Sequence, residues 1–212
     1  VQTTGEGGQW QARLLSADGS RFEVSFDGKV EGVVDWQLTG QHNVANALAV
    51  LAAARHVGVV PALGIEALGK FINAKRRMEK VAEVNGVTVY DDFAHHPTAI
   101  ATTLDGLRKR VGDEQIIAVI EPRSNSMKLG AHRDGLAESA VQADAVFWYA
   151  PPNLGWDLAA TVAGATNPTQ VCDSLEAIID GVKARVRPGT QVVIMSNGGF
   201  GGLHGKLAKA LS

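Results

Sequence analysis

The sequence is poor in the features that mark secreted, membrane-spanning and nucleic-acid-binding proteins. Among 212 residues there is one cysteine, Cys172, so the chain cannot form an internal disulfide and a reducing cytoplasm is the expected compartment. No apolar run approaches the roughly 18 residues that span a bilayer. The formal net charge is -2, with no basic excess. We therefore expect no membrane partner and no nucleic-acid partner.

The first third of the sequence predicts a small antiparallel sheet followed by two helices. Trp10–Ser16 and Arg21–Phe26 alternate between apolar and polar residues on either side of a glycine-containing turn, which is typical of a hairpin. Val30–Leu38 adds a third strand. Asn43–Val57 repeats its apolar residues with a helical period, and Pro61–Asn73 carries proline in its first turn, as helices often do.

A compact basic stretch, Ala74–Met78, precedes a change of pattern, and we expect two domains there, residues 1–73 and 74–212. Beyond it, Val81–Val84 and Val87–Tyr90 flank Asn85-Gly86, a strong hairpin signal. Helices and strands then alternate, with expected bounds Pro97–Val111 (helix), Gln115–Glu121 (strand), Asp134–Gln142 (helix), Ala145–Tyr149 (strand), Ser174–Arg185 (helix), Gln191–Ser196 (strand) and Leu203–Leu211 (helix).

The last three of these strands are nearly continuous apolar runs rather than alternating ones. Strands that are buried on both faces have this composition, and such strands belong to parallel sheets covered by helices. The expected fold class is therefore α/β, with a mainly parallel, Rossmann-like sheet flanked by helices.

Polar or glycine-rich loops follow four of the predicted strands, after Tyr90, Glu121, Tyr149 and Met195. In open α/β sheets, ligands bind beyond the carboxyl ends of the strands. Because all four loops fall at that same predicted edge, we expect a binding or catalytic site there.

The densest of these polar segments is Tyr90–Ile100, YDDFAHHPTAI, with two carboxylates and two imidazoles within six residues. Burying so many ionisable groups for stability alone is costly, so chemistry or ligand binding is the favoured interpretation. Capping of the helix at Pro97 is the simpler alternative. A zinc site is disfavoured, because adjacent histidines such as His95 and His96 point apart.

The other loops also have two interpretations. The segment after Glu121, PRSNSMK, either is a solvated loop or binds a carboxylate or phosphate. The segment SNGGFGG after Met195 either is a flexible turn or presents backbone N–H groups to an anion at the start of the last helix. His204, in that helix, is expected to be a surface or packing residue.

Two motifs resemble one family. Gly40–Leu51, GQHNVANALAVL, is similar to a segment of the central domain of Mur ligases, and Asp91–Pro97, DDFAHHP, resembles the segment that opens their C-terminal domain. Lys75–Glu79 lies between them, as a basic run does in that family. The resemblance covers essentially the whole chain. It implies that residues 1–73 are the tail of the ATP-binding central domain and that 74–212 form the C-terminal Mur ligase domain.

Within the family, EPRSNSMKLG and SNGGFGGLH look most like the members that join the recycled tripeptide L-alanyl-γ-D-glutamyl-meso-diaminopimelate to UDP-N-acetylmuramate with ATP. The implied reaction passes through an acyl phosphate that the incoming amine attacks, in peptidoglycan recycling. Such a reaction depends on neutralising phosphate charge and positioning the amine more than on a nucleophilic side chain. The resemblance leaves the L-alanine-adding ligase as the alternative.

The resemblance also implies roles for individual residues. His42, Asn43 and Asn46 would contact the adenine and its surroundings, and Asp92 the ribose hydroxyls. Arg77 would approach the ATP phosphates, with His95 and His96 at the reacting centre. The peptide substrate would be held by Arg123, Ser124, Asn125 and Lys128, and its amine-bearing end by Ser196 and Asn197.

The phosphate-binding pattern G-x-x-x-x-G-K-[ST], which the family keeps early in its central domain, is missing from the sequence. The UDP-sugar domain and the carboxylates that bind Mg²⁺ are also missing, so we expect no metal ligands here. We therefore expect a fragment that is inactive alone and works with the N-terminal and central domains of the same parent chain. A non-catalytic nucleotide- or peptide-binding module, and a metal hydrolase using Asp91, Asp92, His95 and His96, remain alternatives.

Overall fold

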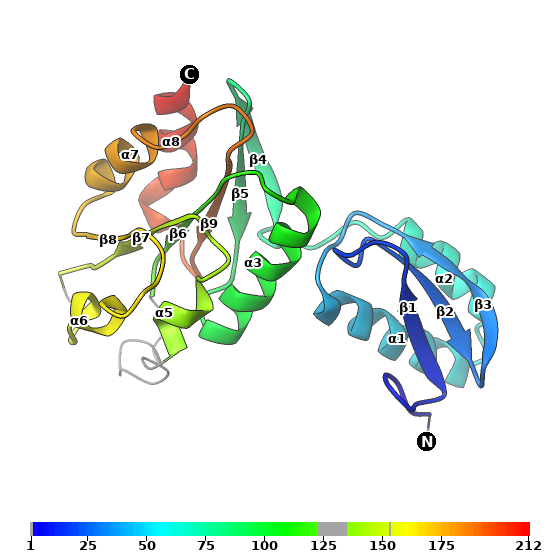
Figure 1. Cartoon of the computed structure of the whole chain (residues 1–212). Helices are drawn as coiled ribbons and strands as arrows, with labels where there is room; N and C mark the ends of the chain where they lie inside the picture. The colour runs from blue at the N-terminus through cyan, green and yellow to red at the C-terminus, as the bar shows by residue number, and fades with distance from the viewer. Residues whose placement is uncertain (1, 123–134, 153) are drawn as a thin grey trace. The chain divides into compact units, whose positions relative to one another are not determined.

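A computed structural model describes residues 2–122, 135–152 and 154–212 of the chain (Figure 1). The chain divides into two compact units. Unit 1 consists of Val1–Asn73 with Asp105–Val111, and unit 2 of Ala74–Leu104 with Gly112–Ser212. Within the described residues, no helix is both long and apolar enough to cross a bilayer.

Unit 1 contains a three-stranded antiparallel sheet and two helices. The strands β1 (Trp10–Leu14), β2 (Arg21–Phe26) and β3 (Lys29–Asp35) pair in the order β1-β2-β3, which confirms the predicted hairpin and third strand. Helices α1 (Gln41–His56) and α2 (Pro61–Gly69) follow. One apolar core joins sheet and helices; its largest members are Trp10, Phe22, Trp36, Leu48 and Leu51.

The second helix of unit 1 ends four residues earlier than predicted. Its last residue is Gly69 rather than Asn73. Phe71 and Ile72 are 49% and 89% exposed, so no apolar surface covers them. Because most helical stability in proteins comes from burying an apolar face, the helix has no reason to continue there.

Unit 2 is built on a six-stranded sheet in the order β4-β5-β9-β6-β7-β8. β4 (Glu79–Val84) and β5 (Val87–Asp92) form the predicted hairpin, and Asn85 and Gly86 both have the positive φ that a tight two-residue turn requires. The remaining pairings, which involve β6 (Ile116–Ile120), β7 (Ala145–Tyr149), β8 (Thr169–Cys172) and β9 (Gln191–Met195), are all parallel. The predicted α/β class with a mainly parallel sheet is confirmed.

Helices cover both faces of this sheet (Figure 1). Helices α7 (Leu175–Lys183) and α8 (Leu203–Leu211) pack on one face through Ile178, Val182, Leu203 and Leu207. Helix α3 (Pro97–Val111), whose bounds match the prediction, lies on the other face with α5 (Leu136–Ser139). The five residues of β6 and of β9 are all buried, as their continuous apolar runs predicted.

Three short elements of unit 2 were not predicted, one of them the 3-10 helix Phe200–Gly202, and one helix was predicted too long. Helix α6 (Leu158–Val162) has five residues, too few for a helical period to show, and it begins at the capping side chain of Asp157. The edge strand β8 buries only Cys172 and reads as TQVC. Of the helix expected at Asp134–Gln142, the described residues contain only α5, which begins at Leu136 and ends at Ser139.

Two helical glycines of unit 2 offer a matched test of this packing. A Cβ added to Gly181 in α7 would lie 2.3 Å from Phe147 Cε1, whereas a Cβ on Gly205 in α8 meets nothing within 4 Å. Gly181→Ala should therefore lower the free energy of unfolding by about 1–3 kcal/mol through overpacking. Gly205→Ala should raise it by up to about 1 kcal/mol, the usual gain in helix propensity. Urea unfolding measures both, and a shift of the same sign in the two variants would contradict the packing described here.

Candidate active-site edge

The C-terminal ends of three adjacent strands of unit 2 carry buried polar side chains. Asp91 and Asp92 end β5, Ser196 follows β9, and Glu121 follows β6. Their exposed fractions are 9%, 3%, 0% and 6%. The sheet order brings together residues that are far apart in the chain, so the expected convergence of polar loops at this edge is confirmed for the described part.

Asp92 binds two backbone amides with its carboxylate. Oδ2 accepts a hydrogen bond from Met78 N at 2.8 Å, and Oδ1 accepts one from Ala94 N at 2.7 Å. Burial raises the pKa of Asp92, while these two hydrogen bonds and the charge of Arg77 oppose the shift. The carboxylate thus fixes the turn before β4 to the segment after β5. Its predicted contact with a ribose stays a prediction, and it would be additional to this structural role.

Asp91 belongs to a polar cluster on the other face of β5. Arg76 Nε donates to Asp91 Oδ2 at 3.1 Å, and His204 Nε2 lies 3.1 Å from Asp91 Oδ1. These two atoms make no hydrogen bond with each other, so the second contact is a close polar contact. Arg76 Nη2 also donates to the carbonyl oxygens of Ser196 (2.6 Å) and Gly198 (2.8 Å).

Ser196 links the ends of β9 and β6. Its hydroxyl donates to Glu121 Oε2 at 2.5 Å and accepts a hydrogen bond from Gly198 N at 2.9 Å. Its own N–H donates to Asp92 O at 3.1 Å. The side chain is fully buried and bound within the protein, so positioning of a substrate amine by this hydroxyl remains a prediction. Asn197, the next residue, is partly exposed.

The Phe93 ring lies close to the side chains of Arg76, Arg77 and His95. The guanidinium carbon of Arg77 is 5.5 Å from the centre of its ring and that of Arg76 is 5.3 Å, both within cation–π range. The His95 ring stands edge-on to Phe93 at 5.5 Å, and His95 Nδ1 lies 2.8 Å from Phe93 O. His96 is also partly exposed, and its carbonyl accepts from Ile100 N in the first turn of α3.

The predicted adenine-binding residues lie in the first turns of α1 in unit 1. His42 and Asn46 are exposed. Asn43 is partly buried and donates from Nδ2 to Thr39 O at 2.7 Å. Gly40, with φ 94°, precedes the helix, and a Cβ there would lie 2.6 Å from the His42 ring. Helix α1 therefore exposes His42 and Asn46, while Asn43 stabilises the loop before the helix. Binding near an adenine by these residues stays a prediction.

Four predicted substrate-binding residues, Arg123, Ser124, Asn125 and Lys128, lie outside the described residues. Among the residues that are described, no group of three or more His, Cys, Asp or Glu side chains could hold a metal ion.

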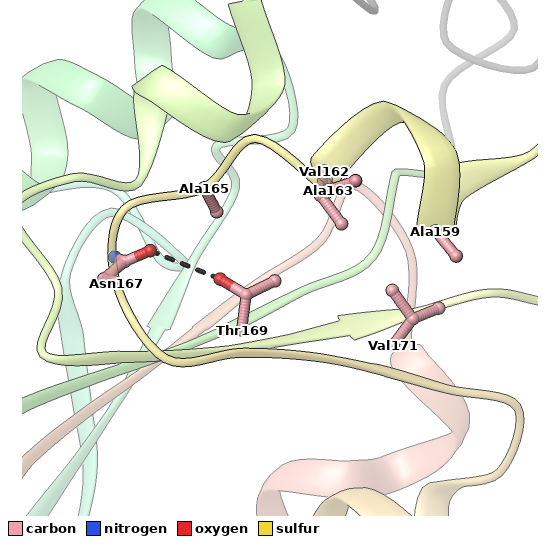
Figure 2. Close-up of a pocket in the computed structure, with 7 residues that line it drawn as sticks. All are labelled: Ala159, Val162, Ala163, Ala165, Asn167, Thr169 and Val171. Atoms are coloured by element: carbon pink, nitrogen blue, oxygen red, sulfur yellow. Dashed lines mark hydrogen bonds between the residues drawn. The ribbon is translucent and has the colours of Figure 1, made fainter.

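A hollow of about 370 Å³ lies beside the edge strand β8 and helix α6 (Figure 2). Its lining is Ala159, Val162, Ala163, Ala165, Asn167, Thr169 and Val171, with no ionisable group. Asn167 donates to the carbonyls of Ala140 and Ala143 and accepts from Thr169. Because its polar atoms serve the fold, we place the site at the strand ends and not in this hollow.

Comparison with known proteins shows the family of the chain. Residues 76–198 match the family described as Mur ligase, glutamate ligase domain. The chain belongs to the Mur ligase family. A relative from Escherichia coli K12, named UDP-N-acetylmuramate–L-alanyl-γ-D-glutamyl-meso-2,6-diaminoheptandioate ligase, is 50% identical over 212 residues, which are 100% of this chain and 46% of the relative.

Two further comparisons show which branch of the Mur ligase family this chain resembles more. The crystal structure of a murein peptide ligase from Psychrobacter arcticus 273-4 is 48% identical, with a TM-score of 0.71, over 96% of this chain and 44% of that chain. The UDP-N-acetylmuramate–L-alanine ligase of Acidothermus cellulolyticus is 34% identical over 87% of this chain and 40% of the relative. The chain therefore spans about half the length of these curated relatives and is more similar to the tripeptide-adding branch.

Sequence reasoning missed three residues of this Mur ligase edge. Arg76 and Glu121 were not considered as site residues, although each binds across strand ends. His204, expected as a surface or packing residue, lies against Asp91. A signal was present for Glu121, a carboxylate directly after a fully buried strand, whereas Arg76 could not be told from its neighbours in a basic run.

The raised pKa of Asp92 predicts a pH dependence. The folded state holds this proton more tightly than the unfolded chain, so the ionisation of Asp92 lowers the free energy of unfolding as pH rises from about 3.9, the ordinary value, through the raised folded-state value. Across that window Asp92→Asn should gain stability relative to the wild-type chain, with the difference level at higher pH. Urea unfolding at a series of pH values measures this, and a difference that moves in the opposite direction would refute the assignment.

Ser196 predicts a stability effect without a change of charge. Ser196→Ala leaves the buried Glu121 carboxylate without its donor and Gly198 N without its acceptor, so the free energy of unfolding should fall by about 1–3 kcal/mol. Ser212→Ala is the matched control, because the Ser212 hydroxyl is exposed and binds only Ala208 O. That variant should stay within about 0.5 kcal/mol of wild type. Equal effects in thermal or urea unfolding would show that the link between β9 and β6 contributes nothing.

Proposed function

We propose that this chain is part of an ATP-dependent ligase that joins L-alanyl-γ-D-glutamyl-meso-diaminopimelate to UDP-N-acetylmuramate in the cytoplasm, in peptidoglycan recycling. The observation that carries the proposal is 50% identity along the whole chain to a relative named for that reaction. The lower identity to the L-alanine ligase makes L-alanine the second candidate for the amine substrate.

We propose that different residues of the chain bind ATP and the amine substrate. Arg77 is an exposed residue beside Phe93, so burial does not prevent it from contacting a phosphate. Guanidinium groups suit phosphate because they are always charged and donate in a planar fork. We propose that Arg77 binds the phosphates of ATP and that His42, Asn43 and Asn46 bind near its adenine.

The amine substrate would lie at the strand-end edge. We propose that His95, His96, Asn197 and the backbone of the loop after β9 face it, with Arg123, Ser124, Asn125 and Lys128 holding its carboxylates. This edge has buried acids that are already bound within the protein and therefore gives a rigid floor. The chain would orient the amine and exclude water, while ATP supplies the activated carboxylate as an acyl phosphate.

Mg²⁺ is a cofactor of this proposal only through the rest of the enzyme. Among the described residues, no group of three or more His, Cys, Asp or Glu side chains could hold a metal ion, and we propose that the ion is held mainly by residues beyond this chain. The proposed partners are accordingly the N-terminal and central domains of the same polypeptide, and we expect the 212-residue chain to have no ligase activity alone.

Substrate choice tests the proposal. In a polypeptide of the relatives' full length, ADP release and mass spectrometry should show tripeptide ligation with kcat/KM at least about 100-fold above that with L-alanine, because a site built for polar groups rejects a substrate lacking them. Arg77→Gln should lower kcat/KM for ATP by about 10–100-fold, the loss of a charge-assisted contact. A preference for L-alanine would assign the chain to the L-alanine-adding ligases instead. Full activity of Arg77→Gln would contradict the proposal that Arg77 binds the ATP phosphates.

A further inference from the structure

Arg76 occupies an unusual position in the polypeptide. Its φ is 61° and that of Met78 is 51°, so Arg77 stands between two left-handed residues that are not glycine. Such conformations are energetically unfavourable and persist only where the surroundings impose them. The contacts that hold this turn therefore also fix the direction in which the Arg77 side chain projects from the backbone.

Arg76 itself provides much of that hold. Its N–H donates to Glu79 Oε2 at 2.8 Å, and its carbonyl accepts from Phe93 N at 2.9 Å. Its guanidinium is bound by the Asp91 carboxylate and by the carbonyls of Ser196 and Gly198. One side chain thus contacts the end of β5 and the loop after β9, across 120 and 122 residues of sequence.

We propose that Arg76 is a positioning residue that couples the loop after β9 to the turn carrying Arg77. This inference rests on the proposed function, in which that loop faces the amine substrate and Arg77 binds the ATP phosphates. Arg76 touches neither ligand. It sets the distance between the loop after β9 and the turn that carries Arg77. An amine held by the loop and a phosphate held by Arg77 are thereby kept at the separation that the reaction requires.

Lysine cannot replace this arginine. The three acceptors of Arg76 lie around a planar fork, and a lysine ammonium is a point charge on a flexible stem that reaches one or two of them. Arg76→Lys therefore keeps the charge beside Asp91 while releasing a carbonyl of the loop. Arg185→Lys is the matched control, because Arg185 also donates to a carbonyl, Gly181 O, and lies 5.0 Å from an aromatic ring, Phe147.

A double-mutant cycle tests the coupling in the full-length polypeptide. Arg76→Lys should lower kcat/KM for ATP about tenfold, with KM raised as well as kcat lowered, and should cost nothing further in an Arg77→Gln background. Arg185→Lys should leave both constants unchanged. A merely structural role would reduce only the active fraction, and therefore kcat alone. Multiplicative losses in the double variant, or wild-type kinetics of Arg76→Lys, would overturn the proposal.

A second measurement separates this inference from the proposed function. In the 212-residue chain, Arg76→Lys should speed amide hydrogen exchange at Phe93 and Gly198 by about tenfold or more, whereas Arg185→Lys should not. Unchanged exchange would overturn the coupling even if the enzyme is a ligase. Absence of ATP-dependent ligation by the wild-type polypeptide would overturn the proposed function instead. If Arg76→Lys fails to fold, Asp91→Asn, which weakens the same cluster from its other side, replaces it in both experiments.

Discussion

Three carboxylates, those of Asp91, Asp92 and Glu121, are buried at neighbouring strand ends of unit 2 and determine which segments meet at this edge. Removing a carboxylate from water costs several kcal/mol unless hydrogen bonds or an opposite charge compensate for it. Asp92 is compensated by two backbone amides, Glu121 by a serine hydroxyl, and Asp91 by a guanidinium with an imidazole nearby. The hydrogen-bond donors come from the turn before β4, the segment after β5 and the loop after β9, and the imidazole comes from the start of α8. Burying the acids therefore draws these separate segments onto one surface.

The two aspartates have different partners because of the pleat of the strand. Successive residues of β5 point to opposite faces of the sheet, so neighbours of the same type enter different surroundings. Asp91 aligns with Ile194 and meets His204 on the α8 face, whereas Asp92 aligns with Met195 on the opposite face. Asp91 binds Arg76, which in turn holds the loop after β9, and Asp92 binds the backbone of the turn that carries Arg77. The acid pair in DDFAHHP is thus divided between two supporting tasks.

Much of the fold was predictable because local patterns report burial. The continuous apolar runs of β6, β7 and β9 indicated a sheet covered on both faces, and Asn85-Gly86 indicated the hairpin that starts unit 2. Strand β8 was missed because it is an edge strand with one buried residue. The gathering of polar residues at one edge of the sheet was predictable from the loops after the strands, and the family from two motifs. The contacts of Arg76 could not be foreseen, since no local pattern encodes a left-handed arginine or its partners 120 residues away.

The position of β9 has a consequence for folding. This strand lies between β5 and β6 and pairs with both, yet it follows them by about a hundred and about seventy residues of sequence. During synthesis β5 and β6 leave the ribosome with no neighbour on their facing edges, and the sheet cannot close until residue 195 has emerged. Non-local parallel pairing of this kind is slow, and unpaired apolar edges recruit other chains. The nascent polypeptide is thus exposed to aggregation for longest at the strands that later carry the buried acids, and chaperone protection would matter most in that interval.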